Sequence, residues 1–124
     1  MLILWDIDAT LITTTRVGLR ALEAAGRELF GPRFDVERVE VAGRLDPLII
    51  RDLLRAHNLP ADAFAPLRDG YRAHLGTLLA QGPAANVHAK ALPGVMDLLA
   101  LLRRRDDVTL GLLTGNYRET GSMK

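Results

Sequence analysis

The chain has 124 residues, of which 48% are hydrophobic, and its 16 basic and 15 acidic residues leave a net charge of +1. This length allows one domain, or one domain with a fragment of another, and the hydrophobic content indicates a globular chain. The near-neutral charge argues against a dedicated nucleic-acid surface, and the absence of cysteine excludes disulfides, thiol chemistry and cysteine-based metal sites.

The first predicted element is a short buried strand over residues 2–5, followed by two carboxylates, Asp6 and Asp8. The strand period of two points both side chains to one face, unless the chain has already begun to turn. Two adjacent carboxylates repel each other, and a divalent cation such as Mg²⁺, which prefers oxygen ligands, relieves that repulsion. The alternative is a strand end that carries two solvated acids. Because Asp6 and Asp8 interrupt the apolar start, we expect no signal peptide, no membrane span and a cytoplasmic protein.

Three amphipathic helices are predicted next, within residues 14–85. The first runs to about residue 30 and starts at the hydroxyls of residues 13–15, which are typical N-caps. The second covers about residues 46–57, with Pro47 in its first turn, and the third covers about residues 61–81. The side chains expected to face inward are Leu19, Leu22, Gly26 and Leu29, then Leu48, Ile49, Leu53 and Leu54, then Phe64, Leu67, Tyr71, Leu75 and Leu78.

A further helix and strand complete the predicted elements. Pro93 and Gly94 open a helix whose inward residues are expected to be Val95, Leu98, Leu99 and Leu102. It leads into a second buried strand over residues 108–113, so the two strands and the crossover make one parallel βαβ unit. Thr114, Gly115 and Asn116 follow this strand, and such a turn can hold a phosphate oxygen with its hydroxyl and exposed N–H groups. The alternative is an ordinary turn that caps a helix.

Together these segments resemble the haloacid dehalogenase superfamily, whose members are mostly phosphatases. Residues 6–10 (Asp-Ile-Asp-Ala-Thr) match its first motif, with Ala9 where the family usually has glycine, and residues 110–114 match its second motif. Residues 42–49 and 92–99 resemble the phosphoglycolate-phosphatase-like branch. The resemblance implies an α/β fold, in which a partial Rossmannoid parallel-sheet core (residues 1–13 and 86–124) carries an inserted α-helical cap (residues 14–85).

The resemblance also implies a role for each motif residue. Asp6 matches the nucleophile that forms an aspartyl-phosphate, and Asp8 matches the general acid and base. Thr114 matches the hydroxyl that holds the phosphoryl group, with Gly115 and Asn116 in the same phosphate-binding turn. Asp6 and Asp8 are the expected ligands of Mg²⁺, which lowers the repulsion between a carboxylate and a phosphate dianion.

Two further residues lie at the start of the second helix of the cap. In the branch that the chain resembles, the loop that holds Arg44 and Asp46 faces the active site and helps to choose the substrate. The alternative reading is a plain helix N-terminus with an acidic residue in its first turn.

The resemblance ends early, because the family has a lysine and one or two further acids downstream of the second motif. Lys124 could stand for that lysine, but we expect it to be a solvated terminal residue and the chain to be about the first half of a hydrolase. The expected function is Mg²⁺-dependent hydrolysis of a small phosphomonoester; the alternative is a catalytically incomplete binding or assembly module. The expected partners are a small phosphorylated substrate and another copy that completes the sheet, with no nucleic acid and no membrane.

Overall fold

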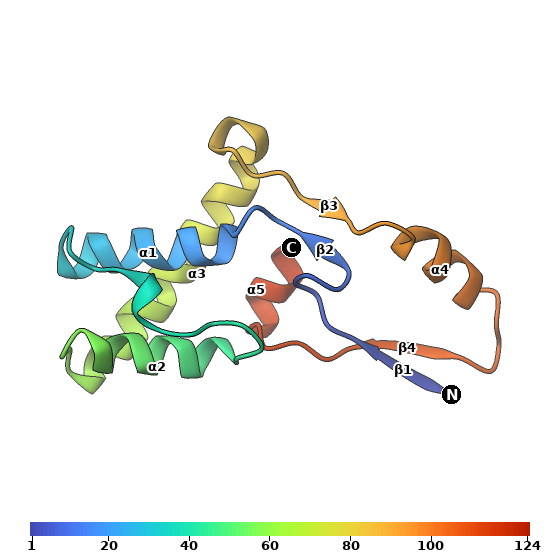
Figure 1. The fold of residues 1–124 in the computed structure, drawn as a ribbon, viewed down its shortest axis with the longest axis horizontal. Helices are drawn as coiled ribbons and strands as arrows, with labels where there is room; N and C mark the ends of the chain where they lie inside the picture. The colour runs from blue at the N-terminus through green and yellow to red at the C-terminus, as the bar shows by residue number, and fades with distance from the viewer.

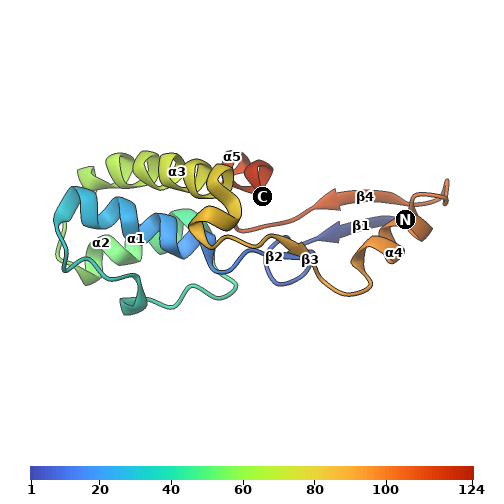
Figure 2. The ribbon, with the colours of Figure 1, turned by 90° about the horizontal axis from the view of Figure 1, so that it is seen from above.

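The computed structural model describes residues 1–124 and shows a long molecule with its three longest helices at one end and its strands, with a shorter helix, at the other (Figures 1 and 2). We keep the name cap for residues 14–85 and use core part for residues 1–13 with 86–124. The cap consists of helices, and the core part holds every strand. None of the helices combines the length and the apolar character needed to cross a membrane.

The cap is built from three α-helices, α1 (Val17–Phe30), α2 (Asp46–Ala56) and α3 (Phe64–Gln81). Short 3-10 turns, η1 (Val36–Arg38), η2 (Ala61–Ala63) and η3 (Gly82–Ala85), connect or extend them. Helices α1 and α3 make the most extensive helix–helix contact in the molecule. Their apolar faces meet α2 in one hydrophobic core, whose fully buried side chains include Val17, Ile50, Leu53, Leu67 and Leu75.

One glycine makes this packing possible. A Cβ atom added at Gly26 in α1 would lie 2.1 Å from the ring of Phe34, far inside van der Waals contact. Phe34 is itself only 2% exposed, so its ring has little room to move away. Gly26 therefore serves close packing, at the cost of some intrinsic helix stability.

The core part contains two short β-sheets. Strands β1 (Leu2–Trp5) and β4 (Thr109–Leu112) pair in parallel, with Leu2 opposite Thr109 and Trp5 opposite Leu112, and α4 (Val95–Leu102) lies between them in sequence. This arrangement confirms the predicted α/β fold with a parallel strand pair. Strands β2 (Ile12–Thr13) and β3 (Lys90–Ala91) form an unpredicted antiparallel pair, and the chain ends in α5 (Arg118–Met123).

Burial in the core part was predicted wrongly. No residue of α4 is buried, and Leu98, expected to face inward, is 42% exposed. Both strands of the parallel pair are exposed or half-buried along their whole length, although the sequence predicted buried strands. The reason is geometric: a parallel sheet is covered on both faces only when several strands and helices form its layers, and here the parallel sheet has two strands.

The cap differs from expectation in smaller ways. Helix α1 begins at Val17 after Arg16, and no side chain caps it, so the threonines at 13–15 are not its N-caps. Helix α3 begins at Phe64 because residues 61–63 form a 3-10 turn. Leu48 is 37% and Leu29 45% exposed, because Ile50 rather than Leu48 completes the buried face of α2, and Phe30 packs against the core in the last turn of α1.

Candidate functional site

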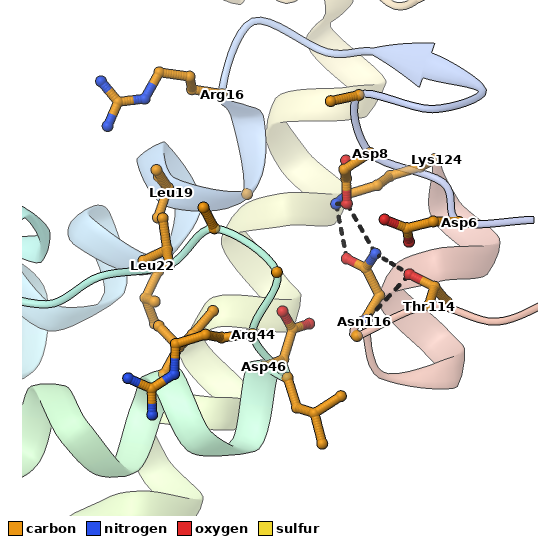
Figure 3. A pocket seen from close by; sticks show the side chains of 18 of the residues that line it. Asp6, Asp8, Arg16, Leu19, Leu22, Arg44, Asp46, Thr114, Asn116 and Lys124 are labelled. Atoms are coloured by element: carbon orange, nitrogen blue, oxygen red, sulfur yellow. Dashed lines mark hydrogen bonds and ion pairs between the residues drawn. The ribbon is translucent and has the colours of Figure 1, made fainter.

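The seven residues singled out from the sequence all line one cavity between the cap and the core part, with a volume of about 730 Å³ (Figure 3). The core part contributes the two acids and the residues of the turn after β4. The cap contributes Arg44, Asp46 and apolar side chains, among them Leu19 and Leu22. The structure thus brings together segments more than a hundred residues apart in the sequence.

Asp6 and Asp8 reach this cavity because the chain turns sharply after β1. Ile7, which lies between them, is only 5% exposed, and its carbonyl accepts hydrogen bonds from the backbone N–H groups of three residues further along the turn. The turn requires a left-handed backbone at Ala9, which has φ 59°, a conformation that glycine adopts more readily than alanine does. The carboxylate of Asp6 accepts a hydrogen bond of 2.8 Å from the backbone N–H of Ile7.

The turn after β4 is tied directly to Asp8. The side-chain amide of Asn116 donates to the Thr114 hydroxyl at 2.7 Å and to the Asp8 carboxylate at 2.8 Å (Figure 3). The two motifs predicted from the sequence therefore form one hydrogen-bonded group. Gly115 lies so close to the cap that a Cβ atom there would be 2.5 Å from the Arg44 carbonyl oxygen.

Lys124 also belongs to this group, and the expectation that it is solvated is wrong. Its side chain is 5% exposed, and its ammonium donates to Asp8 at 2.6 Å and to the side-chain oxygen of Asn116 at 2.7 Å. The two acceptors offset the cost of removing the ammonium from water. Helical spacing could have indicated this position, because Lys124 directly follows α5 and comes four residues after the buried Thr120, so its side chain continues the same face.

Arg44 and Asp46 do not contact the carboxylates of Asp6 and Asp8. The Arg44 guanidinium pairs with Asp52 of α2 and is turned away from Asp6 and Asp8 (Figure 3). Asp46 is the first residue of α2, as the plain reading of a first-turn acid expects, and its carboxylate accepts hydrogen bonds from Tyr71, Tyr117 and Thr120.

Burial shifts the pKa values of Asp46 and of its neighbour Tyr71. Removal from water raises the pKa of the Asp46 carboxyl above its ordinary value, although the hydrogen bonds that it accepts act in the opposite direction. Burial, together with the charge of Asp46, also raises the pKa of the Tyr71 hydroxyl. Tyr71 was predicted from the sequence only as an inward-facing residue of the third helix, and Thr120 was not singled out at all.

The donor set suits a loosely held magnesium ion. No group of three or more acidic, histidine or cysteine side chains converges in the structure, so it has no closed metal cage. Mg²⁺ in phosphate-handling sites is commonly held by one or two carboxylates, with water and substrate oxygens in the remaining positions. Asp6 and Asp8 supply such carboxylates, and Asp8 already carries the donors Asn116 and Lys124, whereas Asp6 accepts only from a backbone N–H.

Comparison with known proteins establishes the fold. No protein-family model matches the chain, and no curated protein matches it. Among solved structures, CbbY from Rhodobacter sphaeroides in complex with phosphate is similar, with a TM-score of 0.74 and 21% identity. The match covers 96% of the chain and 52% of CbbY, so the chain spans about half the length of that protein. The chain therefore shares the fold of the matched half of CbbY, in agreement with the α/β fold that its motifs predicted.

Proposed function

We propose that this chain carries the catalytic residues of a Mg²⁺-dependent phosphatase that hydrolyses a small phosphomonoester through an aspartyl-phosphate. The observation that supports it most is the group formed by Asp8, Thr114, Asn116 and Lys124, with Asp6 beside it on the same cavity. A cavity of about 730 Å³ falls within the range of roughly 300–1,000 Å³ that small-molecule sites occupy. The similarity to a phosphate-bound CbbY points in the same direction.

In the first half of the proposed reaction, a carboxylate oxygen of Asp6 attacks the phosphorus atom of the ester. A bond forms between that oxygen and phosphorus, and the bond between phosphorus and the alcohol oxygen breaks. Asp8 donates its proton to the departing alcohol oxygen, so the product leaves as a neutral alcohol. The phosphoryl group then remains on Asp6 as a mixed anhydride.

In the second half, Asp8 accepts a proton from water, whose oxygen attacks the same phosphorus atom. The bond between phosphorus and Asp6 breaks, inorganic phosphate leaves, and Asp8 regains the proton that the next turnover requires. One carboxyl group can serve both steps because the first leaves it deprotonated and the second returns the proton.

The remaining residues position and neutralise the phosphoryl group. The Thr114 hydroxyl and the backbone N–H groups of its turn are the donors proposed for the phosphoryl oxygens. Lys124 supplies a cation next to the acids, which is the role that the resembled family gives to a downstream lysine. Bound Mg²⁺ would supply further neutralisation of the phosphate charge, held by Asp6 and Asp8. Phosphoryl transfer depends mostly on such positioning and electrostatic stabilisation.

Turnover of a generic aryl phosphate by the full-length protein in the presence of Mg²⁺ tests this proposal. Asp6→Asn should abolish turnover because an amide does not form the acyl phosphate, and Asp8→Asn should lower kcat by about 10²- to 10⁴-fold. Asp106→Asn is the matched control, since this exposed acid lies in the turn before β4, outside the cavity, and should leave activity unchanged. Full activity in Asp6→Asn would refute the mechanism, and no activity in any form would favour a binding or assembly module.

A further inference from the structure

The cap and the core part meet at a second polar cluster, separate from the acids proposed for catalysis. Its centre is Asp46, whose backbone N–H donates to the Gly115 carbonyl at 2.8 Å. One oxygen of its carboxylate accepts from the Tyr117 N–H at 3.1 Å, the Thr120 hydroxyl at 3.2 Å and the Tyr71 hydroxyl at 3.3 Å. Asp46 thus makes three hydrogen bonds to the core part and one to α3.

These bonds are not those of an ordinary helix cap. Leu45 occupies the N-cap position of α2, and the Asp46 side chain bonds to other elements instead of to its own helix. Thr120 is fully buried and Tyr71 is 3% exposed, so the cluster is largely shielded from water. A carboxylate in such a place costs free energy unless donors converge on it, and here three donors do.

The cluster connects directly to the residues of the proposed active site. Tyr117 is the N-cap of the short helix α5, Thr120 lies in its first turn, and the helix ends one residue before Lys124. Gly115 lies between Thr114 and Asn116. The hydrogen bonds of Asp46 hold the start of α5 and the turn after β4 in place. They therefore also fix the positions from which Lys124 and Asn116 reach Asp8. The tight contact of Gly115 with the cap adds to this constraint, because the turn has no space to shift toward Arg44.

The two linkers that join the cap to the core part have an uncommon backbone conformation and few polar contacts with each other. Three linker residues adopt a left-handed backbone conformation: Thr15 with φ 52°, Arg16 with φ 55° and Asn86 with φ 54°. A single hydrogen bond of 3.0 Å, from the His88 N–H to the Thr15 hydroxyl, joins the two linkers to each other. A few residues at element ends are the usual location of a hinge.

We propose that Asp46 is a positioning residue that clasps the cap onto the core part. With the clasp formed, the cap covers the cavity and Lys124 and Asn116 are held against Asp8; with the clasp broken, the cap swings about the linkers at residues 14–16 and 86–89. Closure of this kind excludes water and completes a catalytic arrangement. The consequence for turnover rests on the proposed phosphatase function, whereas the consequence for cap closure does not.

A distance measurement between the two parts tests the clasp without relying on activity. The chain has no cysteine, so Arg51→Cys in α2 and Met96→Cys in α4, both at exposed positions, can carry spin labels without background in the full-length protein. The parent protein should give a narrow distance distribution. Adding Asp46→Ala should broaden it and shift it to longer distances, while Asp62→Ala, an exposed acid in η2, should leave it unchanged.

Two conservative variants separate positioning from simple loss of folding. Asp46→Asn keeps one acceptor oxygen and should restore most of the narrow distribution, and Thr120→Val, which keeps the shape of threonine, should reproduce part of the broadening. If Asp46→Ala does not fold, Thr120→Val decides the question. In the active protein, Asp46→Ala should lower kcat/KM by about 10²-fold, the scale of a small misplacement of reacting groups.

The outcomes of this experiment distinguish the clasp from the phosphatase. An unchanged distance distribution in folded Asp46→Ala and in Thr120→Val would overturn the clasp, whatever happens to activity. A broadened distribution in a protein that hydrolyses no phosphate ester would support the clasp and refute the proposed function.

Discussion

The cap and the core part of this chain differ sharply in how they bury apolar side chains. Fourteen of the fifteen residues in the hydrophobic core cluster lie in the cap, the exception being Val87 in the linker that follows it. The core part instead exposes large apolar side chains, namely Met1, Leu2, Leu4, Met96, Leu98, Leu101, Leu112, Leu113 and Met123. The cap has the interior of a small domain, whereas the strands that position the proposed catalytic acids have little covering.

The difference means that most of the buried apolar packing and the residues proposed for catalysis lie in different parts of the chain. The cap can hold its shape by burying its own apolar faces, with Gly26 at a point of close packing. This packing also fixes the position of Asp46 at the start of α2. The core part positions Asp6 and Asp8 by one parallel strand pair and by the polar contacts of Asn116 and Lys124. Polar contacts at the site therefore supplement the limited apolar packing around these strands.

The largest expected contrast comes from the same substitution made in both regions. Leu67→Ala removes a fully buried side chain of α3 and should lower the free energy of unfolding by about 2–5 kcal/mol. Leu101→Ala in α4, where the side chain is 61% exposed, should change it by less than about 0.5 kcal/mol. Urea denaturation measures both, and equal effects would contradict the difference between the regions.

A smaller effect should follow from adding a methyl group to the cap. Gly26→Ala forces a Cβ atom against the Phe34 ring and should destabilise the protein by about 1–3 kcal/mol, even though alanine favours helices. Gly76→Ala in α3 is the control, because the nearest atom to its Cβ would be 4.0 Å away, and it should stabilise by roughly 0.5–1 kcal/mol. Thermal unfolding of the two variants compares them; stabilisation by Gly26→Ala would mean that this packing is looser than described.

Self-association should distinguish the two surfaces. Both strands of the parallel pair have an open edge, and Leu2 and Leu4 are 62% and 49% exposed, so we expect the 124-residue chain to associate at micromolar concentration. Replacing both leucines with lysine should give a monomer in sedimentation experiments. The same pair of substitutions at Leu29 and Leu48 on the cap should leave association intact. A monomeric parent chain would show that the strand pair needs no further covering.

The smallest effect concerns pH and the junction between the regions. Burial raises the pKa of Asp46 above its ordinary value of 3.8, so the folded state binds its proton up to a higher pH than the unfolded state does. Stability contributed by this group is therefore present at low pH and is lost as pH rises through that interval. Relative to Asp46→Asn, the parent protein should lose unfolding free energy between about pH 4 and its raised pKa and then stay level. A relative gain over the same interval would contradict the sign.

The sequence predicted the helices of residues 14–85 well because their apolar pattern is local. Helical spacing placed Leu67, Tyr71 and Leu75 on one face of α3, and all three are buried. The parallel pairing of the two strands was also predicted correctly. The burial of the core part was predicted wrongly. An apolar strand sequence indicates that the strand suits a buried position, but it does not show which other strands and helices cover it.

The sequence predicted which motif residues lie at the candidate site, but not the hydrogen bonds that join them to other parts of the chain. Asp6, Asp8 and Thr114 were found from motifs, and the structure places them on one cavity, although their roles remain proposals. Lys124 was wrongly expected to be solvated, because its placement depends on how α5 packs against the cap. The clasp at Asp46 was invisible for the same reason: it joins Tyr71 and Thr120, residues 25 and 74 positions away.

Trapping the covalent intermediate on Asp6 tests the central proposal most directly. The full-length protein is mixed with a phosphomonoester and Mg²⁺, quenched during turnover, and treated with borohydride, which reduces an acyl phosphate on aspartate to homoserine. Tandem mass spectrometry of the peptide that holds residues 1–16 should then find homoserine at position 6, with Asp8 unmodified and with no conversion in Asp6→Asn. Phosphate release without conversion at Asp6, or with conversion at another residue, would contradict the proposed nucleophile.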